Sequence, residues 1–502
     1  MTMLFMKKKY QLERFFVTWL MILFMILTDA FTAFAQVKQA TFLVNGISCD
    51  LEQGILKVEF VTPDVVRVQY TGENTFIGNG TDVCLPRAVD NPVRWVYTPN
   101  PDCYLLKSDS LIVRVDLSTA SITYLDKEGG LLLQEDQNIP RISEKRVTKQ
   151  VIYDEHSKHI EKTADGDKEI KNVLRYDTIG HTWKYRINFK WQPLEALYGW
   201  GAHMEDYMNL RGKELYLCQH NLKAMVPVLN STAGYGLLFD AGCAMMFKDN
   251  SEGSFVELEA AKQIDYYFMK GKTMDAVVAN YRLLTGNSPM MPLYLFGYIQ
   301  SKERYVSSDD LINTLKEYRQ RQIPIDMIVQ DWNYWPEGQW GNMSMNPKFY
   351  PDKRKLADEI HSLHAKLMIS IWPNAMNCPQ HEEFRRKGWL LSGTSVYDAF
   401  NPLARKLYWN YANNEFFGNG FDAWWCDASE PLDADWTFMK DGYGADNHRQ
   451  RWELNTNLLN SVLGAERSQL YSLYHAKGIY ENQRSTNEDK RVVNPVSYTH
   501  LT

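Results

Sequence analysis

The sequence predicts a multidomain chain in which a β-sandwich is followed by an incomplete (β/α)8 barrel, of which the chain holds the N-terminal half. From residue 36 to about residue 290, short runs of alternating apolar and polar side chains stand between turn residues, which is typical of half-buried antiparallel strands. Beyond Pro292, short apolar runs alternate with helical patterns, and this rhythm indicates parallel strands connected by helices. We therefore expect two structural domains, over residues 36–290 and 291–494.

The strands of the first domain are indicated by their period-two alternation. They are expected at residues 56–61, 65–70, 111–116, 121–124 and 131–134, with turns at Thr62-Pro63 and Gly129-Gly130. Many short strands joined by turns favour a sandwich. Residues 154–171 are charged and contain glycine, so they predict a solvated loop or hairpin without a function of its own.

The second domain alternates strands and helices. Strands are expected at residues 295–300, 327–331, 367–372 and 423–427, and helices at residues 307–318, 355–365, 405–416 and 451–483. Ser307, with Asp310 three residues later, is typical of a helix N-cap. Val492-Val493 is a candidate start of a fifth strand.

A polar or aromatic residue stands at the end of each expected strand of this domain. Gln300, Asp331, Trp372 and Asp427 each end a strand or follow it directly. The carboxyl ends of the strands share one face of a barrel, and that face carries the active site. The sequence therefore predicts that these four residues line one site.

Asp427 carries the strongest chemical signal of the four. It ends an otherwise apolar strand, where a carboxylate costs desolvation energy unless it has partners or a function. A carboxylate held rigidly at a strand end suits attack on an anomeric carbon, and Trp425, on the same side of the strand, suits the wall of a sugar pocket. Glu430, in the loop just beyond, is placed to support them. Spacing alone equally allows a purely structural role, in which the Asp427 side chain caps the N-terminus of a following helix.

The pattern formed by Trp425, Asp427 and Glu430, W-x-D-x-x-E, resembles the nucleophile signature of glycoside hydrolase family 31. Further stretches resemble the family in the same order: Leu197-Tyr-Gly-Trp-Gly, Gly234-Tyr-Gly-Leu-Leu-Phe-Asp, Phe296-Gly-Tyr-Ile-Gln-Ser-Lys-Glu-Arg-Tyr, Pro324-Ile-Asp-Met-Ile-Val-Gln-Asp-Trp-Asn-Tyr-Trp and Ile369-Ser-Ile-Trp-Pro-Asn. The likeness runs from about residue 40 to residue 494. The ordered set carries the resemblance, because one short motif has low specificity.

The resemblance implies a galactose-mutarotase-like sandwich, a catalytic barrel, and retaining hydrolysis of α-linked glucosides or xylosides without a metal or an organic cofactor. It implies that Asp427 is the nucleophile and that Asp331 binds sugar hydroxyls remote from the scissile bond. Trp372 and Trp425 would line the subsite for the released sugar. The loop at residues 219–221 matches the place where the sandwich of the family reaches into the site.

The substrate expectation comes from the forms QSKERY, QDWNYWPEGQWG and WWCDASEP, which most resemble bacterial α-xylosidases that act on xyloglucan oligosaccharides. Release of α-xylose is therefore the expected activity. An α-glucosidase of the same family and a non-catalytic carbohydrate-binding protein stay open as alternatives. Discrimination by one hydroxymethyl group is worth only about 1–3 kcal/mol, so few substitutions separate the two enzymes.

A retaining glycosidase also needs a second carboxyl group, about 5–5.5 Å from the first, as general acid/base. In the family this is an aspartate in a W-x-G-D motif, and no such motif follows Asp427. The remaining candidates lack that context: Asp433, Asp435, Asp441, Asp446 and Asp489. Residues 495–502 depart from the family and resemble the translation of a transposon end used in sequencing libraries. We therefore expect a truncated fragment with a non-native tail, without its acid/base, and inactive or insoluble when expressed as written.

The N-terminus and the charge restrict location and partners. A basic segment and an apolar run at residues 15–27 precede Ala33-Phe34-Ala35, which predicts a signal peptide over residues 1–35. We expect an exported protein, periplasmic or extracellular, with no membrane segment after cleavage. The net charge of −6 provides no basic surface for nucleic acid, and an oligosaccharide is the expected partner.

Other site classes have weaker signals. His361 and His364 lie on an expected helix near Glu359, but a third ligand is missing, so no metal is expected. Ser429 lacks the G-x-S-x-G context of a serine nucleophile. Seven scattered cysteines without a CxxC pair leave one or two disulfides open.

Overall fold

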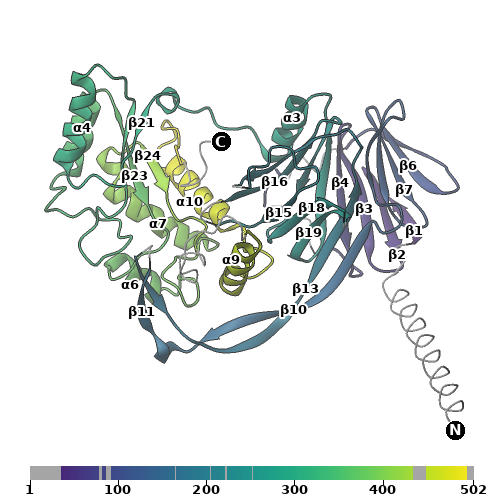
Figure 1. Ribbon diagram of the computed structural model, residues 1–502, viewed down its shortest axis with the longest axis horizontal. Coiled ribbons are helices and arrows are strands. Elements are labelled where there is room, and N and C mark those ends of the chain that lie inside the picture. Colours follow the sequence, from purple (N-terminus) through teal and green to yellow (C-terminus); the bar gives the residue numbers. More distant parts are fainter. Residues whose placement is uncertain are drawn as a thin grey trace, which may run out of the picture.

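The structure is a computed structural model, and it describes residues 36–77, 82–85, 92–163, 166–203, 205–220, 223–251, 253–432 and 448–494. Figure 1 shows an all-β domain beside an α/β domain, with a long two-stranded arm that reaches from the first toward the second. The sandwich and the parallel strands expected from the alternation patterns are both present. The expected signal peptide, residues 1–35, and the tail, residues 495–502, lie outside the described residues.

Two antiparallel sheets form the sandwich. The first has eight strands in the order β1-β2-β3-β4-β20-β17-β16-β14. Their bounds are β1 Val37–Phe42, β2 Gly46–Leu51, β3 Ile55–Thr62, β4 Val65–Thr71, β20 Ile264–Lys270, β17 Tyr235–Phe239, β16 Ala224–Ser231 and β14 Leu197–Ala202. Helix α3 (Met274–Thr285) covers the outer face of this sheet, where its Val277 and Leu284 pack with Leu238 and Tyr267.

The second sheet has ten strands. Nine follow the order β15-β18-β19-β13-β9-β8-β7-β6-β5, and β10 pairs with β13. Their bounds are β15 Glu214–Leu217, β18 Met245–Asn250, β19 Gly253–Ala261, β13 Val173–Lys190, β9 Leu131–Glu135, β8 Ile122–Asp126, β7 Leu111–Asp116, β6 Cys103–Ser108, β5 Trp95–Thr98 and β10 Arg141–Tyr153. The expected strands of this domain are therefore confirmed, with small shifts at their ends.

The core of the sandwich lies between the sheets. Alternate residues of both sheets, such as Leu56 and Val113, are buried there, as the period-two pattern predicts. One ion pair, between Glu135 and Arg141, is also buried. Its charge is tolerated because Glu135 also accepts hydrogen bonds from the Ile122 N–H and from a tyrosine hydroxyl, each at 2.9 Å.

Strands β10 and β13 continue beyond the sandwich as the arm (Figure 1). Its far end is a hairpin of β11 (His159–Thr163) and β12 (Gly166–Ile170), which confirms the hairpin expected at residues 154–171. Near this end the ring of Tyr153 lies against Gly393 of the second domain, where an added Cβ would come within 2.9 Å of the ring. The arm therefore contacts the α/β domain at a position that requires glycine.

The second domain is built on a four-stranded parallel sheet in the order β21-β22-β23-β24. The strands are β21 Ile299–Gln300, β22 Met327–Gln330, β23 Lys366–Ile371 and β24 Ala423–Cys426. The helices are α4 Ser308–Gln320, α5 Lys353–Ser362, α6 Pro379–Arg386, α7 Pro402–Glu415, α9 His448–Leu463 and α10 Tyr471–Thr486. Ser307 caps α4, because its Oγ accepts the Asp310 N–H at 3.1 Å, as predicted.

Two elements differ from the expectation. Residues 295–300 do not form one strand, because a 3-10 turn (Leu293–Phe296) follows Pro292 and only Ile299–Gln300 pairs with β22. The helix expected at residues 451–483 is two helices, since Gly464 adopts φ +87° and ends α9. The chain then reaches back to the sandwich, where the Gln469 N–H donates to the Gly242 carbonyl at 2.9 Å.

All seven cysteines lie within the described residues, are buried, and form no disulfide. Burial raises the pKa of Cys49 and of Cys243 to about 12. No helix in the described part of the chain is long and apolar enough to cross a bilayer.

Candidate active site

The parallel sheet has two different faces, because side chains alternate along each strand. The face toward the helices contributes Ile328, Leu367, Ile369, Ile371, Trp424 and Cys426 to one apolar core. The opposite, interior face contributes Met327, Val329, Met368, Ala423 and Trp425 to another. The neighbours Trp424 and Trp425 therefore point to opposite sides of β24.

The register of the strands brings the predicted site residues together. Ser370 pairs with Trp425, and continuation of the ladders beyond β22, β23 and β24 places Asp331 beside Ser370 and Asp427 beside Trp372. Residues in register on parallel strands point to the same face. Asp331, Trp425 and Asp427 therefore share the interior face at the carboxyl end of the sheet, where barrel enzymes carry their active sites. Trp372 ends β23 between them, and its ring also packs against the core on the helix side.

Gln300, the other strand-end residue expected at this site, lies elsewhere, and that expectation is wrong. Gln300 pairs with Ile328, which faces the helices. Its Oε1 accepts hydrogen bonds from the hydroxyls of Tyr298 and Tyr318, both at 2.6 Å, and Tyr318 belongs to α4. Side chains alternate along β21, so Ile299 faces the interior beside Met327 and Gln300, one residue later, faces the helices.

Asp331 follows β22 and is half-buried. Its Oδ1 accepts the Trp332 N–H at 2.8 Å. Burial raises the pKa of Asp331 to about 6, and Glu303 also raises it, whereas the Trp332 N–H and the Ser370 hydroxyl lower it. This side chain is therefore ionised at neutral pH and loses its charge under mildly acidic conditions.

We expect Asp331→Asn to stabilise the fold at neutral pH while weakening sugar binding. The pKa of Asp331 in the folded chain lies above the value of about 3.9 typical of an unfolded chain. Above about pH 6 the side chain is ionised in both states, and its charge lowers the free energy of unfolding; below about pH 3 it is protonated in both states, and this cost is absent. The free energy of unfolding of the variant should rise by up to about 2 kcal/mol at pH 7 and stay unchanged near pH 3. Urea denaturation at both pH values measures this, with the exposed Asp102→Asn as control. An equal change at both values would contradict it.

Asp427 directly follows β24. Its N–H donates to the Ile371 carbonyl at 3.0 Å, so the ladder with β23 extends to this residue. Its Oδ1 accepts the Ala428 N–H at 3.0 Å. Ala428 has φ +50°, in the left-handed region that is uncommon for residues with a Cβ. The chain therefore turns away immediately after Asp427, whose half-buried side chain stands at the end of a rigid strand.

Tryptophans form a wall beside these strand ends. The ring of Trp340 lies 5.3 Å from that of Trp372, 5.5 Å from that of Trp332 and 5.6 Å from that of Trp335. The Arg304 guanidinium lies 5.9 Å from the centre of the Trp332 ring. Of these, only Trp372 was predicted as a site residue. The signal for the others is three tryptophans within the ten residues after β22, and their flat faces suit the C–H faces of sugars.

The structure locates two further parts of the predicted site, Glu430 and the loop at residues 219–221, whose roles stay predictions. Glu430 is 8% exposed and lies just past Asp427, and its supporting role stays a prediction. In the loop at residues 219–221, the Gln219 N–H donates to Gln469 Oε1 at 2.6 Å, so the loop meets the second domain. Asn221 lies outside the described residues, and the contact of this loop with the sugar stays a prediction.

The histidine pair has a structural explanation. His361 Nε2 lies 2.7 Å from Asp422 Oδ2, just before β24 and at the end of the sheet opposite to Asp427. Glu359 pairs instead with Lys316 of α4 at 2.8 Å. Among the described residues, no group of three or more histidine, cysteine or acidic side chains is placed to hold a metal ion.

Of the carboxylates weighed as general acid/base, the structure describes only Asp489. Asp433, Asp435, Asp441 and Asp446 lie outside the described residues. Asp489 is exposed in the turn after α10, where its N–H bonds to Asn487.

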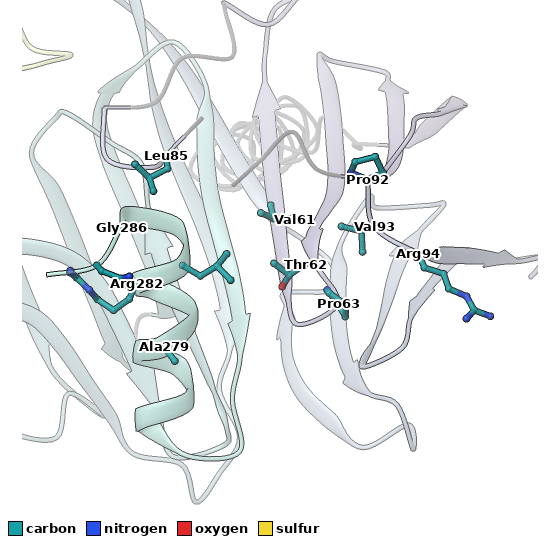
Figure 2. A pocket seen from close by; sticks show the side chains of 12 residues that line it. Val61, Thr62, Pro63, Leu85, Pro92, Val93, Arg94, Ala279, Arg282 and Gly286 are labelled. Carbon is teal, nitrogen blue, oxygen red and sulfur yellow. The ribbon is translucent and has the colours of Figure 1, made fainter. Parts of the chain in front are cut away.

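A separate cleft lies in the sandwich domain, between α3 and the turn that joins β3 to β4 (Figure 2). Val61, Pro63 and Val93 line one side, and Ala279 lines the other. The guanidinium of Arg94 points away from the cleft (Figure 2). No carboxylate is among its described lining residues, so the cleft lacks the groups that glycoside hydrolysis requires.

Two domain models from one family match the chain. The N-terminal galactose mutarotase-like domain of glycosyl hydrolase 31 matches residues 55–247, and the TIM-barrel domain of glycosyl hydrolases family 31 matches residues 288–499. The chain belongs to glycoside hydrolase family 31. The first matched region lies within the sandwich domain and the second spans the parallel α/β domain. The resemblance seen in the ordered motifs is confirmed.

Relatives within family 31 include enzymes named for different sugars. An α-xylosidase of Saccharolobus solfataricus is 29% identical over 448 residues, which cover 87% of this chain and 55% of the relative. The structure of an α-xylosidase from Xanthomonas citri has a TM-score of 0.72 at 20% identity and covers 91% of this chain and 63% of that one. A dextranase of Flavobacterium johnsoniae also has a TM-score of 0.72, at 18% identity, with 92% and 55% covered. The chain thus spans less than two thirds of the length of each of these relatives. Proteins named for different substrates share this fold.

Proposed function

We propose that the chain forms part of a retaining exo-α-glycosidase that releases α-xylose from xyloglucan-type oligosaccharides. The observation that carries the proposal is the shared position of Asp331 and Asp427, at the carboxyl ends of β22 and β24, on either side of Trp372. Two carboxylates and an indole on one rim match the needs of sugar binding and of attack on an anomeric carbon.

In the proposed reaction the Asp427 carboxylate attacks the anomeric carbon while the bond to the leaving oxygen breaks. A glycosyl ester of Asp427 results, and water then hydrolyses it with net retention of configuration. Asp331, ionised above about pH 6, accepts hydrogen bonds from sugar hydroxyls remote from the scissile bond. Trp372 and Trp425 pack against the sugar ring. The proton for the leaving oxygen comes from a second carboxyl group, which we expect to lie outside the described residues.

Xylose is proposed over glucose for two reasons. Proteins named α-xylosidases are among both the similar sequences and the similar structures. The rings of Trp332, Trp340 and Trp372 also lie together beside the strand ends, and a sugar pocket narrowed by these indoles would favour a sugar without a hydroxymethyl group. Proteins named α-glucosidases are similar to this chain as well, so α-glucosidase is the alternative to be tested.

The test is covalent trapping with 5-fluoro-α-D-xylosyl fluoride and its glucosyl counterpart. Fluoride departs without a proton donor, so the first step needs the nucleophile and not the acid/base. We expect a xylosyl adduct on the peptide that contains Asp427, formed about 10-fold or more faster than the glucosyl adduct. The reverse order would indicate an α-glucosidase. Sugar binding without any adduct would indicate a non-catalytic binding protein.

Export is part of the proposal. Cleavage after Ala35 would release a chain that begins at Gln36, and β1 begins at the next residue. N-terminal sequencing of the protein recovered from the periplasm or medium of a bacterial host is expected to give Gln36 as the first residue. A cytoplasmic chain that retains Met1 would contradict export.

A further inference from the structure

Ser370 places a hydroxyl group in an otherwise apolar layer. It is fully buried on the interior face of β23, in register with Trp425 and between Met368 and Trp372 along the strand. Within the described residues, its Oγ has no hydrogen-bond partner. A buried hydroxyl without a partner costs free energy, so a serine here, rather than an alanine or valine, calls for a function.

The polar group beside Ser370 is the carboxylate of Asp331. Asp331 continues β22 next to Ser370, and the hydroxyl lies close enough to lower the pKa of Asp331. The Trp332 N–H already occupies Oδ1 at 2.8 Å. An ionised carboxylate accepts hydrogen bonds and donates none, so a hydroxyl next to it stabilises the charged form more than the protonated form.

The backbone of Ser370 is rigidly held. Its carbonyl accepts the hydroxyl of Tyr334 at 2.9 Å, and β23 lies between β22 and β24 in the sheet. The hydroxyl is thus presented from a fixed position, and little conformational entropy remains to be lost when it bonds to the carboxylate. A neighbour on a rigid strand can fix the direction of a half-buried side chain.

We propose that Ser370 is a positioning residue that donates its hydroxyl to Asp331, holding this carboxylate ionised and directed toward the bound sugar. The proposal rests on the proposed function only in taking Asp331 as a sugar-binding group. Among the described residues, the other titratable groups placed near Asp331 are Glu303 after β21 and Tyr334 after β22. Arg304 lies over the ring of the next residue, Trp332, and Asp427 lies two strands away on the same rim. None of them changes in the variants below.

The first measurement is the titration of Asp331 in the full chain. The backbone N–H of Trp332 bonds to this carboxylate, so the Trp332 indole sits on the residue next to the titrating group. The titration of Asp331 is identified as the step in tryptophan fluorescence that Asp331→Asn removes. We expect this step near pH 6 in the unmodified chain. Ser370→Ala should move it upward by about half to one pH unit, because one hydrogen bond to the charged form is lost. Ser370→Thr, which keeps the hydroxyl, should restore the midpoint.

The matched control is Ser468→Ala, which removes another buried hydroxyl of the second domain, one that bonds to the Ala465 carbonyl. Its midpoint should equal that of the unmodified chain. If Ser370→Ala unfolds, as shown by far-ultraviolet circular dichroism, Ser370→Cys keeps the volume with a weaker donor and should give an intermediate midpoint. An unchanged midpoint in a folded Ser370→Ala or Ser370→Cys chain would overturn the proposal.

The second measurement is the dissociation constant of D-xylose as a function of pH. Ser370→Ala should weaken binding by about 1.5- to 3-fold near pH 6.5, because a pKa raised by half to one unit lowers the ionised fraction of Asp331 by that factor. The difference should shrink by pH 8, where Asp331 is mostly ionised in both chains. A loss that is equal at both pH values would indicate a packing role and contradict the proposal. If Asp331→Asn binds D-xylose as well as the unmodified chain does, Asp331 does not bind the sugar and the proposed function fails. The shift of the Asp331 titration midpoint in Ser370→Ala still decides the role of Ser370 in that case.

Discussion

Asp427→Asn is expected to lower the rate of labelling by 5-fluoro-α-D-xylosyl fluoride by about 10⁴-fold or more. Asparagine has nearly the shape of aspartate, but its amide oxygen carries no charge and is a poor nucleophile. The backbone bond from residue 427 to the Ile371 carbonyl stays in place, so the fold should be unchanged. Intact-mass spectrometry measures the rate, and peptide mapping locates the sugar.

The control is Asp489→Asn, which removes an exposed carboxylate that was also weighed as a catalytic group. It should label at the rate of the unmodified chain. Rapid labelling of a folded Asp427→Asn chain would show that another residue attacks the sugar, and the mapped peptide would identify it.

Trp424→Ala is expected to lower the free energy of unfolding by about 3–5 kcal/mol. Trp424 is 1% exposed and packs edge-on against Trp409, with ring centres 5.6 Å apart. Its Nε1–H also donates to Gln483 Oε1 of α10 at 2.7 Å, so the variant leaves a cavity and an unsatisfied buried amide. The midpoint of urea denaturation, followed by far-ultraviolet circular dichroism, measures the loss.

Trp425→Ala is the matched control one residue along the chain. Trp425 is only partly buried and lies on the interior face of β24. We expect a smaller loss of stability than for Trp424→Ala and a larger loss of D-xylose affinity. If the two variants lost stability and affinity alike, the assignment of the two indoles to opposite faces would be wrong.

The sequence predicted the elements that depend on local pattern. The strands around Thr62-Pro63 follow from alternation, and the cap at Ser307 follows from a hydroxyl placed three residues before an aspartate. The strand ends at Asp331 and Asp427 were also predictable, because an apolar run that stops at a carboxylate marks the exit from a buried strand. These features need only neighbours in sequence.

Other features depend on partners far along the chain. The position of Gln300 on the helix side follows from the register of β21 with β22 and from the contact with Tyr318, neither of which a pattern of single residues specifies. The different roles of Trp424 and Trp425 depend on which side of the sheet the helices cover. The break at Gly464 was visible as a glycine, but its consequence, the docking of Gln469 on the sandwich, required the tertiary structure.

The contact between the arm and the second domain has a consequence for synthesis on the ribosome. The sandwich and its arm emerge first, whereas α9, which contacts β10, and Gly393, which contacts Tyr153, emerge hundreds of residues later. Throughout that interval the arm projects without its covering partner, and Val147 and Ile179 remain 60% and 63% exposed even in the finished fold. Uncovered apolar strands of this kind are the usual sites of association between unfinished chains. The nascent protein is therefore most vulnerable at the arm until the second domain has been made.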